Sequence, residues 1–277
     1  MIYPRYIGIS SIDGVGKETT AKKVLELAKE DFDGEKAKMI SFPRYETDEG
    51  KVITNYLEGK YGDPTLMNPY LASSLYAADR FRYFTEMREN DRGNTRFLIM
   101  DRGYYDNFIH QASKLSSIEE IAQWMKINYK IEVRSMPLVH GCMWEIYYLV
   151  LNEEDRQKQI ANRSHKDLHE SNTEYISKCN EFVKFSQTPL FRNSIIEAFK
   201  KMGYYSMNTY YPEIEYYIDR LRFVEVRHGN TPEEINEYTT KVARAIYMNA
   251  IAYQNMNPSG GDYGYYHPSK WIHPFKE

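Results

Sequence analysis

The sequence predicts an α/β fold in which helices cover both faces of a five-stranded parallel sheet. Two observations favour this fold class. Short apolar runs with the pattern of buried strands alternate along the chain with amphipathic helical stretches. The first of these runs leads through a glycine-rich turn directly into a helix. The apolar runs span residues 6–10, 37–41, 97–100, 145–151 and 223–227.

The first predicted strand and helix flank a turn with the spacing of a Walker-A phosphate loop. Gly14 and Gly16 lack a Cβ, so the backbone can turn tightly and aim its N–H groups at phosphate oxygens. The helix that begins at Lys17 adds the positive end of its dipole, and the Lys17 ammonium can reach the β- and γ-phosphates. We therefore predict an ATP-binding loop made of Asp13, Gly14, Val15, Gly16, Lys17, Glu18 and Thr19.

Two positions depart from the G-x-x-x-x-G-K-[ST] pattern of such loops. Ser11 stands where the first glycine belongs, and Glu18 stands where a hydroxyl would meet Mg²⁺. An ordinary turn that binds nothing, or a decayed nucleotide site, would show the same departures, but the flanking strand and helix favour phosphate binding. With Glu18 at this position, either Thr19 or a water molecule could complete the coordination of Mg²⁺.

Length and composition restrict the class of protein. The 277 residues are 42% hydrophobic, which is enough for one α/β domain with an insertion. The net charge of −3, without a long basic run, argues against a nucleic-acid polymer as partner. Cys142 and Cys179 form neither a disulfide framework nor a metal motif, and no signal peptide or membrane-spanning run is recognisable. We expect a cytoplasmic protein without a membrane partner.

A helix is predicted from Pro69 towards Met87, and it places Tyr76 and Arg80 on one face because they are four residues apart. An aromatic ring beside a guanidinium could stack on a nucleobase and donate to its carbonyl edge. From these two residues alone, however, it is a better explanation that Tyr76 is a core residue and Arg80 a solvated or paired charge than that they recognise a base.

Polar residues follow the strand at 97–100 without a break. Asp101 is placed to coordinate Mg²⁺ or its water ligands, and Arg102 can donate a bidentate pair of hydrogen bonds to a phosphate. A structural salt bridge or a helix cap is the alternative, and the phosphate loop two strands earlier in the chain favours the functional interpretation. Asp106 is expected to be the N-cap of the next helix, and His110, taken alone, is expected to be a satisfied helix residue.

A mobile lid over the nucleotide is predicted in the second half of the chain. A charged helix at 154–163 leads into a polar stretch without apolar periodicity, and the lid would span about 162–171. Arg163 and Lys166 could bring a cation to the transferring phosphoryl group, or they could be solvated charges.

The remaining segments complete the predicted domain organisation. A tyrosine-rich insertion, helical in part at 195–202, is expected at about 186–222. A capping box at 231–234 begins the last helix. All of these would belong to one domain of residues 1–255, followed by an extension at 256–277.

Taken as an ordered set, these motifs resemble those of the thymidylate kinase family, over about residues 5–183 and again over 223–252. The segments that carry the resemblance are 13–17 in the phosphate loop, Phe42-Pro43-Arg44-Tyr45, Asn68-Pro69-Tyr70 with Tyr76 and Arg80 in the same helix, Asp101-Arg102, and the polar stretch 163–170. The resemblance implies a P-loop NTPase fold and an enzyme that transfers the γ-phosphoryl group of ATP to dTMP, giving dTDP and ADP. It also implies Mg²⁺ as cofactor and a homodimer.

The resemblance assigns roles around the base and the sugar of dTMP. It implies that Asp13 holds the sugar 3′-hydroxyl, that Tyr76 stacks on thymine, and that Arg80 donates to a thymine carbonyl. Asp106 and His110 complete this part of the substrate site, with His110 near the sugar, where the family often has tyrosine.

Further roles concern the phosphates. The resemblance implies that Arg102 binds the acceptor phosphate, that Asp101 helps to place Mg²⁺, and that Phe42 walls the acceptor pocket. Arg44 or its neighbour would also touch the acceptor phosphate, although the family's usual arginine lies one residue later, at Tyr45. Family members carry the catalytic arginine in the phosphate loop or in the lid. The loop has a glycine, Gly14, at that position, so the resemblance implies Arg163 of the lid rather than Lys166.

Two other functions fit the same residues. The acceptor could be another deoxynucleoside monophosphate or a deoxynucleoside, because base preference rests on Tyr76 and Arg80. Alternatively, Ser11 and Glu18 could mark lost catalysis in a nucleotide-binding scaffold that docks partners through its tyrosine-rich insertion.

Overall fold

The structure of the protein is a computed structural model. The described residues are 5–12, 15–32, 34–91, 94–134, 143–152, 155, 172–204, 211–227, 229–256 and 274.

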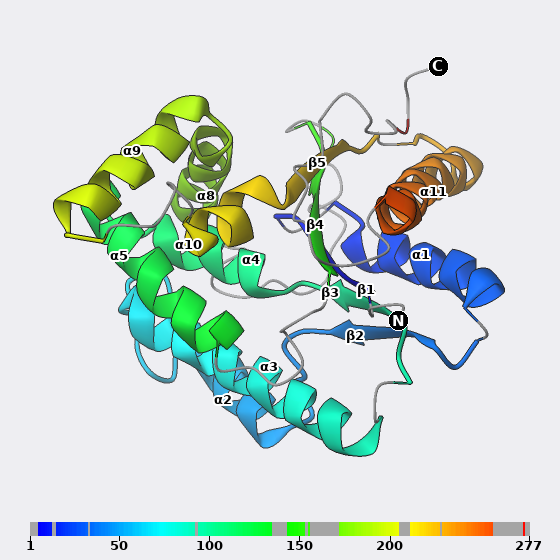
Figure 1. The fold of residues 1–277 in the computed structure, drawn as a ribbon, viewed down its shortest axis with the longest axis horizontal. Helices are drawn as coiled ribbons and strands as arrows, with labels where there is room; N and C mark the ends of the chain where they lie inside the picture. Colours follow the sequence, from blue (N-terminus) through cyan, green and yellow to red (C-terminus); the bar gives the residue numbers. More distant parts are fainter. Residues whose placement is uncertain are drawn as a thin grey trace.

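All strands of the sheet run parallel, in the order β2-β3-β1-β4-β5. The central strand is therefore the first in the chain, and helices lie on both sides of the sheet (Figure 1). The predicted fold class and all five predicted strands are confirmed. The strands are β1 (Arg5–Ser10), β2 (Ala37–Ser41), β3 (Phe97–Asp101), β4 (Met143–Val150) and β5 (Leu221–Glu225).

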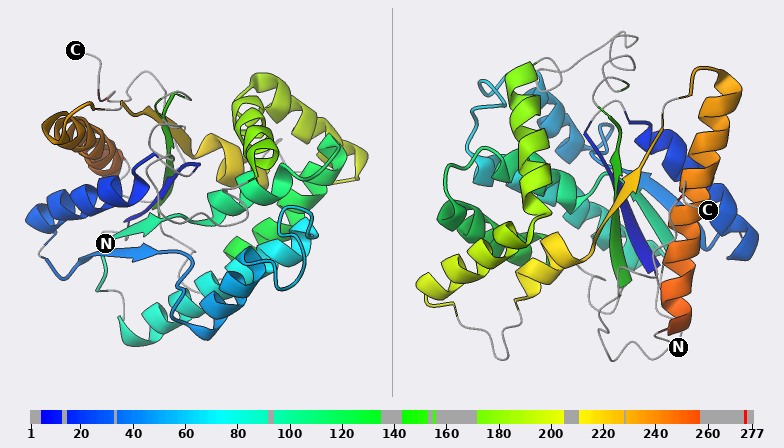
Figure 2. Two further views of the ribbon diagram at one scale, coloured as in Figure 1. Left: turned by 180° about the vertical axis from the view of Figure 1, so that it is seen from behind. Right: turned by 90° about the horizontal axis from the view of Figure 1, so that it is seen from above.

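Two helices, α1 (Lys17–Asp31) and α11 (Pro232–Met256), lie side by side on one face of the sheet (Figure 2). Val24 of α1 and Val242 of α11 share a buried apolar cluster with Ile9 of β1. Both helices bury an apolar stripe and expose charged residues, as the sequence pattern predicts.

The other helices lie on the opposite side of the sheet, where α3 and α5 are central (Figure 1). Phe84, Phe108 and Trp124 form the middle of this second, larger apolar cluster. The helices are α2 (Asp48–Leu57), α3 (Pro69–Asn90), α4 (Tyr104–Asn107), α5 (Ile118–Tyr129), α8 (Thr173–Ser186), α9 (Pro189–Lys201) and α10 (Pro212–Ile214). Three π-helical turns complete the described elements: Phe108–Ala112, Lys130–Arg134 and Glu215–Asp219.

The starts of α3, α5 and α11 follow local capping chemistry. Asn68 accepts hydrogen bonds from the first turn of α3, whose first residue is a proline. Ser117 and Glu120 form a reciprocal capping box at α5. The Thr231 hydroxyl accepts from the backbone N–H of Glu234 at 3.2 Å, as the capping box predicted for α11 requires.

The strand register decides which side chains meet at the carboxyl edge of the sheet. Asp101 of β3 pairs in register with Ile9 of β1 and with Ser41 of β2. The end of β3 therefore lies between the start of the phosphate loop and the loop that follows β2. In open parallel sheets this edge is where ligands bind.

The described part of the predicted insertion at 186–222 packs into the larger apolar cluster. Phe199 of α9, Tyr211 and Tyr217 are each at most 5% exposed and join the same core as α3 and α5. Helix α9 is longer than the predicted segment 195–202. The predicted lid at 162–171 lies outside the described residues.

The extension at 256–277 is described only at Met256, where α11 ends, and at residue 274. The predicted domain boundaries stay predictions. None of the helices in the described ranges is long and apolar enough to cross a membrane.

Candidate active site

The phosphate loop joins the buried end of β1 to the start of α1. Gly16 has a φ of 80°, the left-handed region that favours glycine, and it forms the N-cap of α1. The side chain of Lys17 is 7% exposed, and its ammonium donates to the backbone carbonyl of Ser11 at 3.2 Å. The Lys17 charge therefore folds back over the loop, where a phosphate would lie. Asp13 and Gly14 are outside the described residues.

A tyrosine from the neighbouring strand holds the first turn of this loop. The hydroxyl of Tyr148 in β4 accepts a hydrogen bond from the backbone N–H of Ile12 at 3.1 Å. Burial raises the pKa of Tyr148 well above its ordinary value, so the phenol stays neutral. Sequence reasoning missed this residue, because it belongs to an apolar run that gives no sign of a polar role.

Two buried carboxylates, Asp101 and Asp106, lie beside the loop. Oδ2 of Asp106 accepts from the Ser10 hydroxyl at 2.7 Å and from the backbone N–H of Gly103 at 2.8 Å. Asp106 thus caps α4 from its third residue, and its predicted role as the N-cap residue is wrong. Oδ2 of Asp101 accepts from the Ser41 hydroxyl at 3.2 Å.

The second oxygen of each carboxylate, Oδ1 of Asp101 and Oδ1 of Asp106, is buried and has no hydrogen-bond partner within the described ranges. Burial raises the pKa of Asp101, and the Asp106 charge raises it further, while Lys17 and Arg102 oppose the shift. Buried carboxylate oxygens without partners are the ligands that Mg²⁺ takes in phosphate-transfer sites, together with water and phosphate oxygens. The residues present therefore fit the ion.

The other predicted magnesium ligand is placed differently. Thr19 is exposed on α1, and Glu18 next to it pairs with Lys22 at 2.5 Å on the same solvent-facing side. No group of three or more metal-binding side chains occurs in the described part of the chain. The buried carboxylates Asp101 and Asp106 therefore fit the ion better than Thr19.

Arg102 has a strained backbone at the end of β3. Its φ is 66°, the only positive φ of a non-glycine residue in the described ranges, and its backbone N–H donates to the carbonyl of Ile9 at 3.0 Å. Such a conformation costs about 1–2 kcal/mol for a residue with a Cβ and is concentrated at functional sites. The half-buried Arg102 side chain lies close enough to Asp101 for its charge to oppose the rise in the pKa of that carboxyl.

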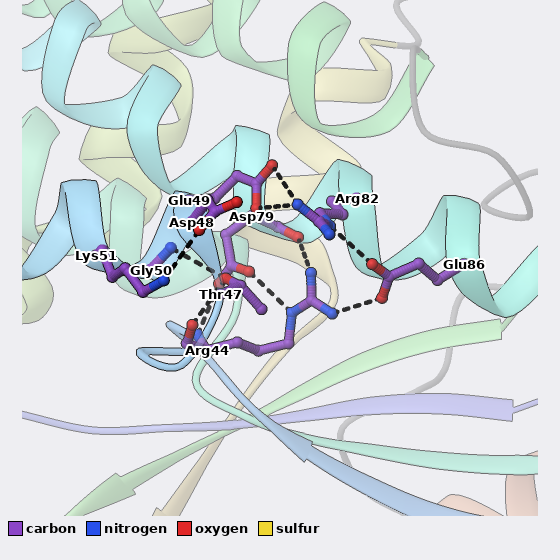
Figure 3. Close-up of polar contacts among 9 residues, drawn as sticks. All are labelled: Arg44, Thr47, Asp48, Glu49, Gly50, Lys51, Asp79, Arg82 and Glu86. Atoms are coloured by element: carbon purple, nitrogen blue, oxygen red, sulfur yellow. Dashed lines mark hydrogen bonds and ion pairs between the residues drawn. The ribbon is translucent and has the colours of Figure 1, made fainter.

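Arg44 lies in a network of charges between the loop after β2 and helix α3 (Figure 3). Its Nε donates to Asp79 Oδ1 at 2.9 Å, its Nη1 to Glu86 Oε2 at 2.7 Å, and its Nη2 to the Asp79 carbonyl at 3.2 Å. Arg82 extends the network from Glu86 to Glu49 of α2. Arg44 therefore clamps the loop onto α3, and its contact with an acceptor phosphate stays a prediction.

Arg80 is also held by a carboxylate. It is 3% exposed and donates through Nε at 2.9 Å, and through Nη2, to Glu132 of the π-helical turn Lys130–Arg134. Asn107 donates to the same carboxylate at 2.8 Å. Sequence reasoning missed Glu132 and Asn107, which give no motif signal, and the role of Arg80 in base recognition stays a prediction.

The aromatic and histidine candidates lie around these charged groups. Tyr76 packs edge-on against Tyr56 with ring centroids 6.2 Å apart, and it is half-buried. Phe42 is buried at the start of the loop after β2. His110 is half-buried, and its Nδ1 lies 3.2 Å from the hydroxyl of Tyr175 in α8. The structure thus gathers Lys17, Asp101, Arg102 and Asp106 at the loop, and it pairs Arg44 and Arg80 with carboxylates.

An open pocket of about 640 Å³ lies elsewhere, on the outer face of α3. Phe81 and Ile131 supply its apolar wall, and Glu49, Arg82 and Glu86 its charged rim. None of the predicted site residues lines this pocket.

A strand, a glycine-capped helix with a buried lysine, and an acidic residue at the end of the adjacent parallel strand define a P-loop nucleotide-binding protein. A family model described as "Thymidylate kinase" matches residues 9–189. The chain belongs to the thymidylate kinase family.

Individual relatives carry the same name. A probable thymidylate kinase of Methanosphaera stadtmanae is 34% identical over 125 residues, which are 44% of this chain and 60% of the length of that protein. The thymidylate kinase structure from Candida albicans aligns with 93% of this chain and 94% of its own, at 18% identity and a TM-score of 0.46. The structure from Ehrlichia chaffeensis aligns with 88% of this chain and 99% of its own, at 12% identity and a TM-score of 0.47.

Proposed function

We propose that this protein transfers the γ-phosphoryl group of ATP to dTMP, giving dTDP and ADP. The observation that carries the proposal is the cluster of Lys17, Asp101, Arg102 and Asp106 at the carboxyl edge of β1 and β3. Membership of the thymidylate kinase family supports the identity of the acceptor.

In this proposal the chain stabilises charge and positions two nucleotides. Lys17 and the N–H groups at the start of α1 bind the phosphates of ATP and neutralise the charge that spreads over the γ-phosphoryl group in the transition state. Asp101 and Asp106 would hold Mg²⁺, which when bound neutralises further phosphate charge. The acceptor phosphate is already an anion, so no strong general base is needed, and alignment of the two phosphates supplies much of the rate.

The acceptor would bind on the α3 side of this cluster. Arg102 would bind the acceptor phosphate, because it directly follows the end of β3 and its charge acts on Asp101. Phe42 would form the wall of the pocket, Tyr76 would stack on the base, and Arg80 would donate to the base carbonyl. Asp13 and His110 would lie at the sugar. Arg44 would act indirectly, by holding the loop after β2 against α3.

An assay of ADP release tests this proposal against the other functions. The acceptors dTMP, dUMP, dCMP, dGMP, AMP and thymidine are compared at saturating ATP and Mg²⁺. We expect the highest kcat/KM with dTMP. A higher kcat/KM with another monophosphate or with thymidine would identify that compound as the acceptor instead of dTMP. Binding of ATP without turnover of any acceptor would indicate a nucleotide-binding scaffold.

The lid cation is tested in the same assay. Arg163 and Lys166 lie outside the described residues, so their roles rest on the family resemblance. We expect Arg163→Ala to lower kcat more than the affinity for ATP. An equal loss for Lys166→Ala with Arg163→Ala unchanged would reassign the role.

The proposal includes a homodimer in the cytoplasm. The family resemblance implies the dimer, and the open apolar pocket on the outer face of α3 offers a surface that a second copy could cover. Phe81 at 45% exposed and Ile131 at 37% exposed are the large apolar side chains that line it. The cytoplasmic location stays an expectation from the composition.

A further inference from the structure

Glu132 is a buried carboxylate that joins two helices on the acceptor side of the molecule. It is 1% exposed and lies in the π-helical turn Lys130–Arg134. Its oxygens accept hydrogen bonds from Nε and Nη2 of Arg80 in α3 and from Nδ2 of Asn107 in α4. Three donors from two elements thus converge on one side chain that has no part in the phosphate loop.

The bidentate pair restricts how Arg80 can point. A guanidinium has five N–H donors in one rigid plane, and two of its nitrogens are engaged by the same carboxylate. This fixes the plane and the direction of the whole group, including the donors that Glu132 does not engage. A single hydrogen bond would leave the guanidinium free to rotate about that bond.

The same carboxylate decides the orientation of the Asn107 amide. Nδ2 of Asn107 donates to Glu132 Oε1 at 2.8 Å and to the backbone carbonyl of Ser73 at 3.1 Å. Both partners are acceptors only, so the amide must present its NH₂ group to them and turn its carbonyl oxygen away. Glu132 therefore sets the direction of a donor group on α3 and of an acceptor group on α4.

We propose that Glu132 is a positioning residue that determines the base selectivity of the acceptor site by holding Arg80 in one orientation. This inference rests on the proposed function, in which Arg80 donates to a carbonyl of thymine, and it takes that carbonyl to be the one at position 4, where thymine and cytosine differ. Cytosine carries an amino group at that position, and a fixed N–H donor cannot pair with it. A guanidinium that can rotate loses this discrimination, because it can move away from the amino group.

The competing explanation is that Arg80 and Glu132 form a purely structural ion pair. Removal of one partner from a buried pair leaves an uncompensated charge and destabilises the fold, so loss of activity in a single variant would not separate the two explanations. Stability and selectivity must therefore be measured together, in variants that move them in different directions.

Three variants provide this separation. Glu132→Gln keeps the size of the side chain but replaces one carboxylate oxygen with an NH₂ group, which cannot accept a hydrogen bond from Arg80 or Asn107. The double variant Arg80→Met/Glu132→Met removes both charges and restores a paired, apolar interior. Glu145→Gln is the control, since Glu145 is 5% exposed and pairs with Arg5 at 3.5 Å near the amino ends of β1 and β4, opposite the phosphate loop.

For each variant, the Tm, the KM for ATP, and kcat/KM for dTMP and dCMP are measured on the full chain. We expect Glu132→Gln to lower the dTMP-to-dCMP ratio of kcat/KM at least tenfold, mainly through KM, with the KM for ATP changed less than twofold. We expect the double variant to recover Tm while its selectivity stays lost. Glu145→Gln should lower Tm and keep the wild-type selectivity.

Two outcomes would overturn the inference. One is a folded Glu132→Gln variant with the wild-type ratio. The other is a double variant in which the dTMP-to-dCMP ratio of kcat/KM recovers together with Tm. This second outcome decides the question if Glu132→Gln does not fold. Failure of the proposed function is recognised separately, because the wild-type chain itself would then show no preference for dTMP.

Discussion

Lys17 illustrates how a single residue carries the electrostatics of the site. Its ammonium is almost completely buried, and it lies within reach of the Ser11 carbonyl and of the field of Asp101. In a site with little water, one positioned charge has a much larger effect on a developing phosphate charge than a solvated lysine has. Lys22, one turn later, is exposed and paired with Glu18, and so provides a natural comparison.

We expect Lys17→Ala to lower kcat about a hundredfold to a thousandfold, the usual loss for one preorganised electrostatic group. Lys22→Ala, which removes an exposed lysine from the same helix, should stay close to wild type. Steady-state kinetics with ATP and dTMP measure both. A near-normal rate for Lys17→Ala would remove the phosphate loop from the mechanism.

Lys114 gives a prediction about pH and stability. Its ammonium donates to the Pro64 carbonyl at 2.7 Å and lies over the rings of Tyr56 and Tyr175. Burial lowers its pKa from 10.5 to about 8, although the charges of Cys179 and Asp63 oppose the shift. Between these pKa values the unfolded chain binds more protons than the folded chain, so the contribution of Lys114 to the free energy of unfolding rises with pH.

Lys114→Met should therefore flatten the rise in stability between about pH 8 and about pH 9.5, measured by urea unfolding at several pH values. Lys126→Met is the control for loss of a lysine that contacts a tyrosine ring, since Lys126 lies 4.2 Å from the ring centroid of Tyr204. The same pH slope in wild type and Lys114→Met would contradict the prediction.

At the scale of elements, the loop after β2 is held against α2 and α3 by contacts that no pattern in its sequence predicts. Arg44 bonds to Asp79 and Glu86, and its carbonyl accepts from the backbone N–H and the hydroxyl of Thr47, the N-cap residue of α2 (Figure 3). This packing brings the backbone of the loop directly onto the first turn of α2. The close approach requires a residue without a side chain at Gly50.

A Cβ at Gly50 would lie 1.9 Å from the carbonyl oxygen of Arg44, so this backbone contact cannot persist in Gly50→Ala. We expect a loss of about 1–3 kcal/mol in the free energy of unfolding, as for other overpacked sites, and a raised KM for the acceptor. Gly34→Ala, where a Cβ meets nothing within 4 Å, is the control. Unchanged urea unfolding of Gly50→Ala would show that the loop can move without cost.

At the scale of the whole molecule, α2 and α3 lie along one edge, away from α1 and α11 (Figure 2). Their outer face combines the open pocket with the charged residues Glu49, Arg82 and Glu86. An apolar centre with a charged rim is the composition of a protein interface. The homodimer proposed above would use this face and leave the nucleotide edge of the sheet open.

Sedimentation of the full chain tests the dimer. We expect wild type at twice the 32.8 kDa of one chain, and Phe81→Glu at the monomer mass, because the substitution would bury a charge in the interface. Leu190→Glu changes an apolar side chain on α9 that is 66% exposed, and it should remain dimeric. A wild-type monomer at micromolar concentration would refute the proposed assembly.

The sequence by itself determined the five strands, the glycine-capped start of α1, and the starts of α3 and α11. These features depend on apolar periodicity and on residues within one turn of each other, so neighbours in the chain are sufficient to define them. The same local signals placed Lys17 at the start of the helix after the first strand and Asp101 at the end of a later strand, and the parallel pairing of β1 with β3 then brought them together.

Only the tertiary structure decided what the buried charges do. Arg44 meets a carboxylate 35 residues away, and Arg80 meets one 52 residues away. No pattern in the sequence marks Glu132 as the partner of Arg80, because pairing over that separation depends on how α3 and the turn after α5 pack. A buried charge must find an opposite charge or pay the cost of desolvation, and the folded chain alone determines which one is within reach.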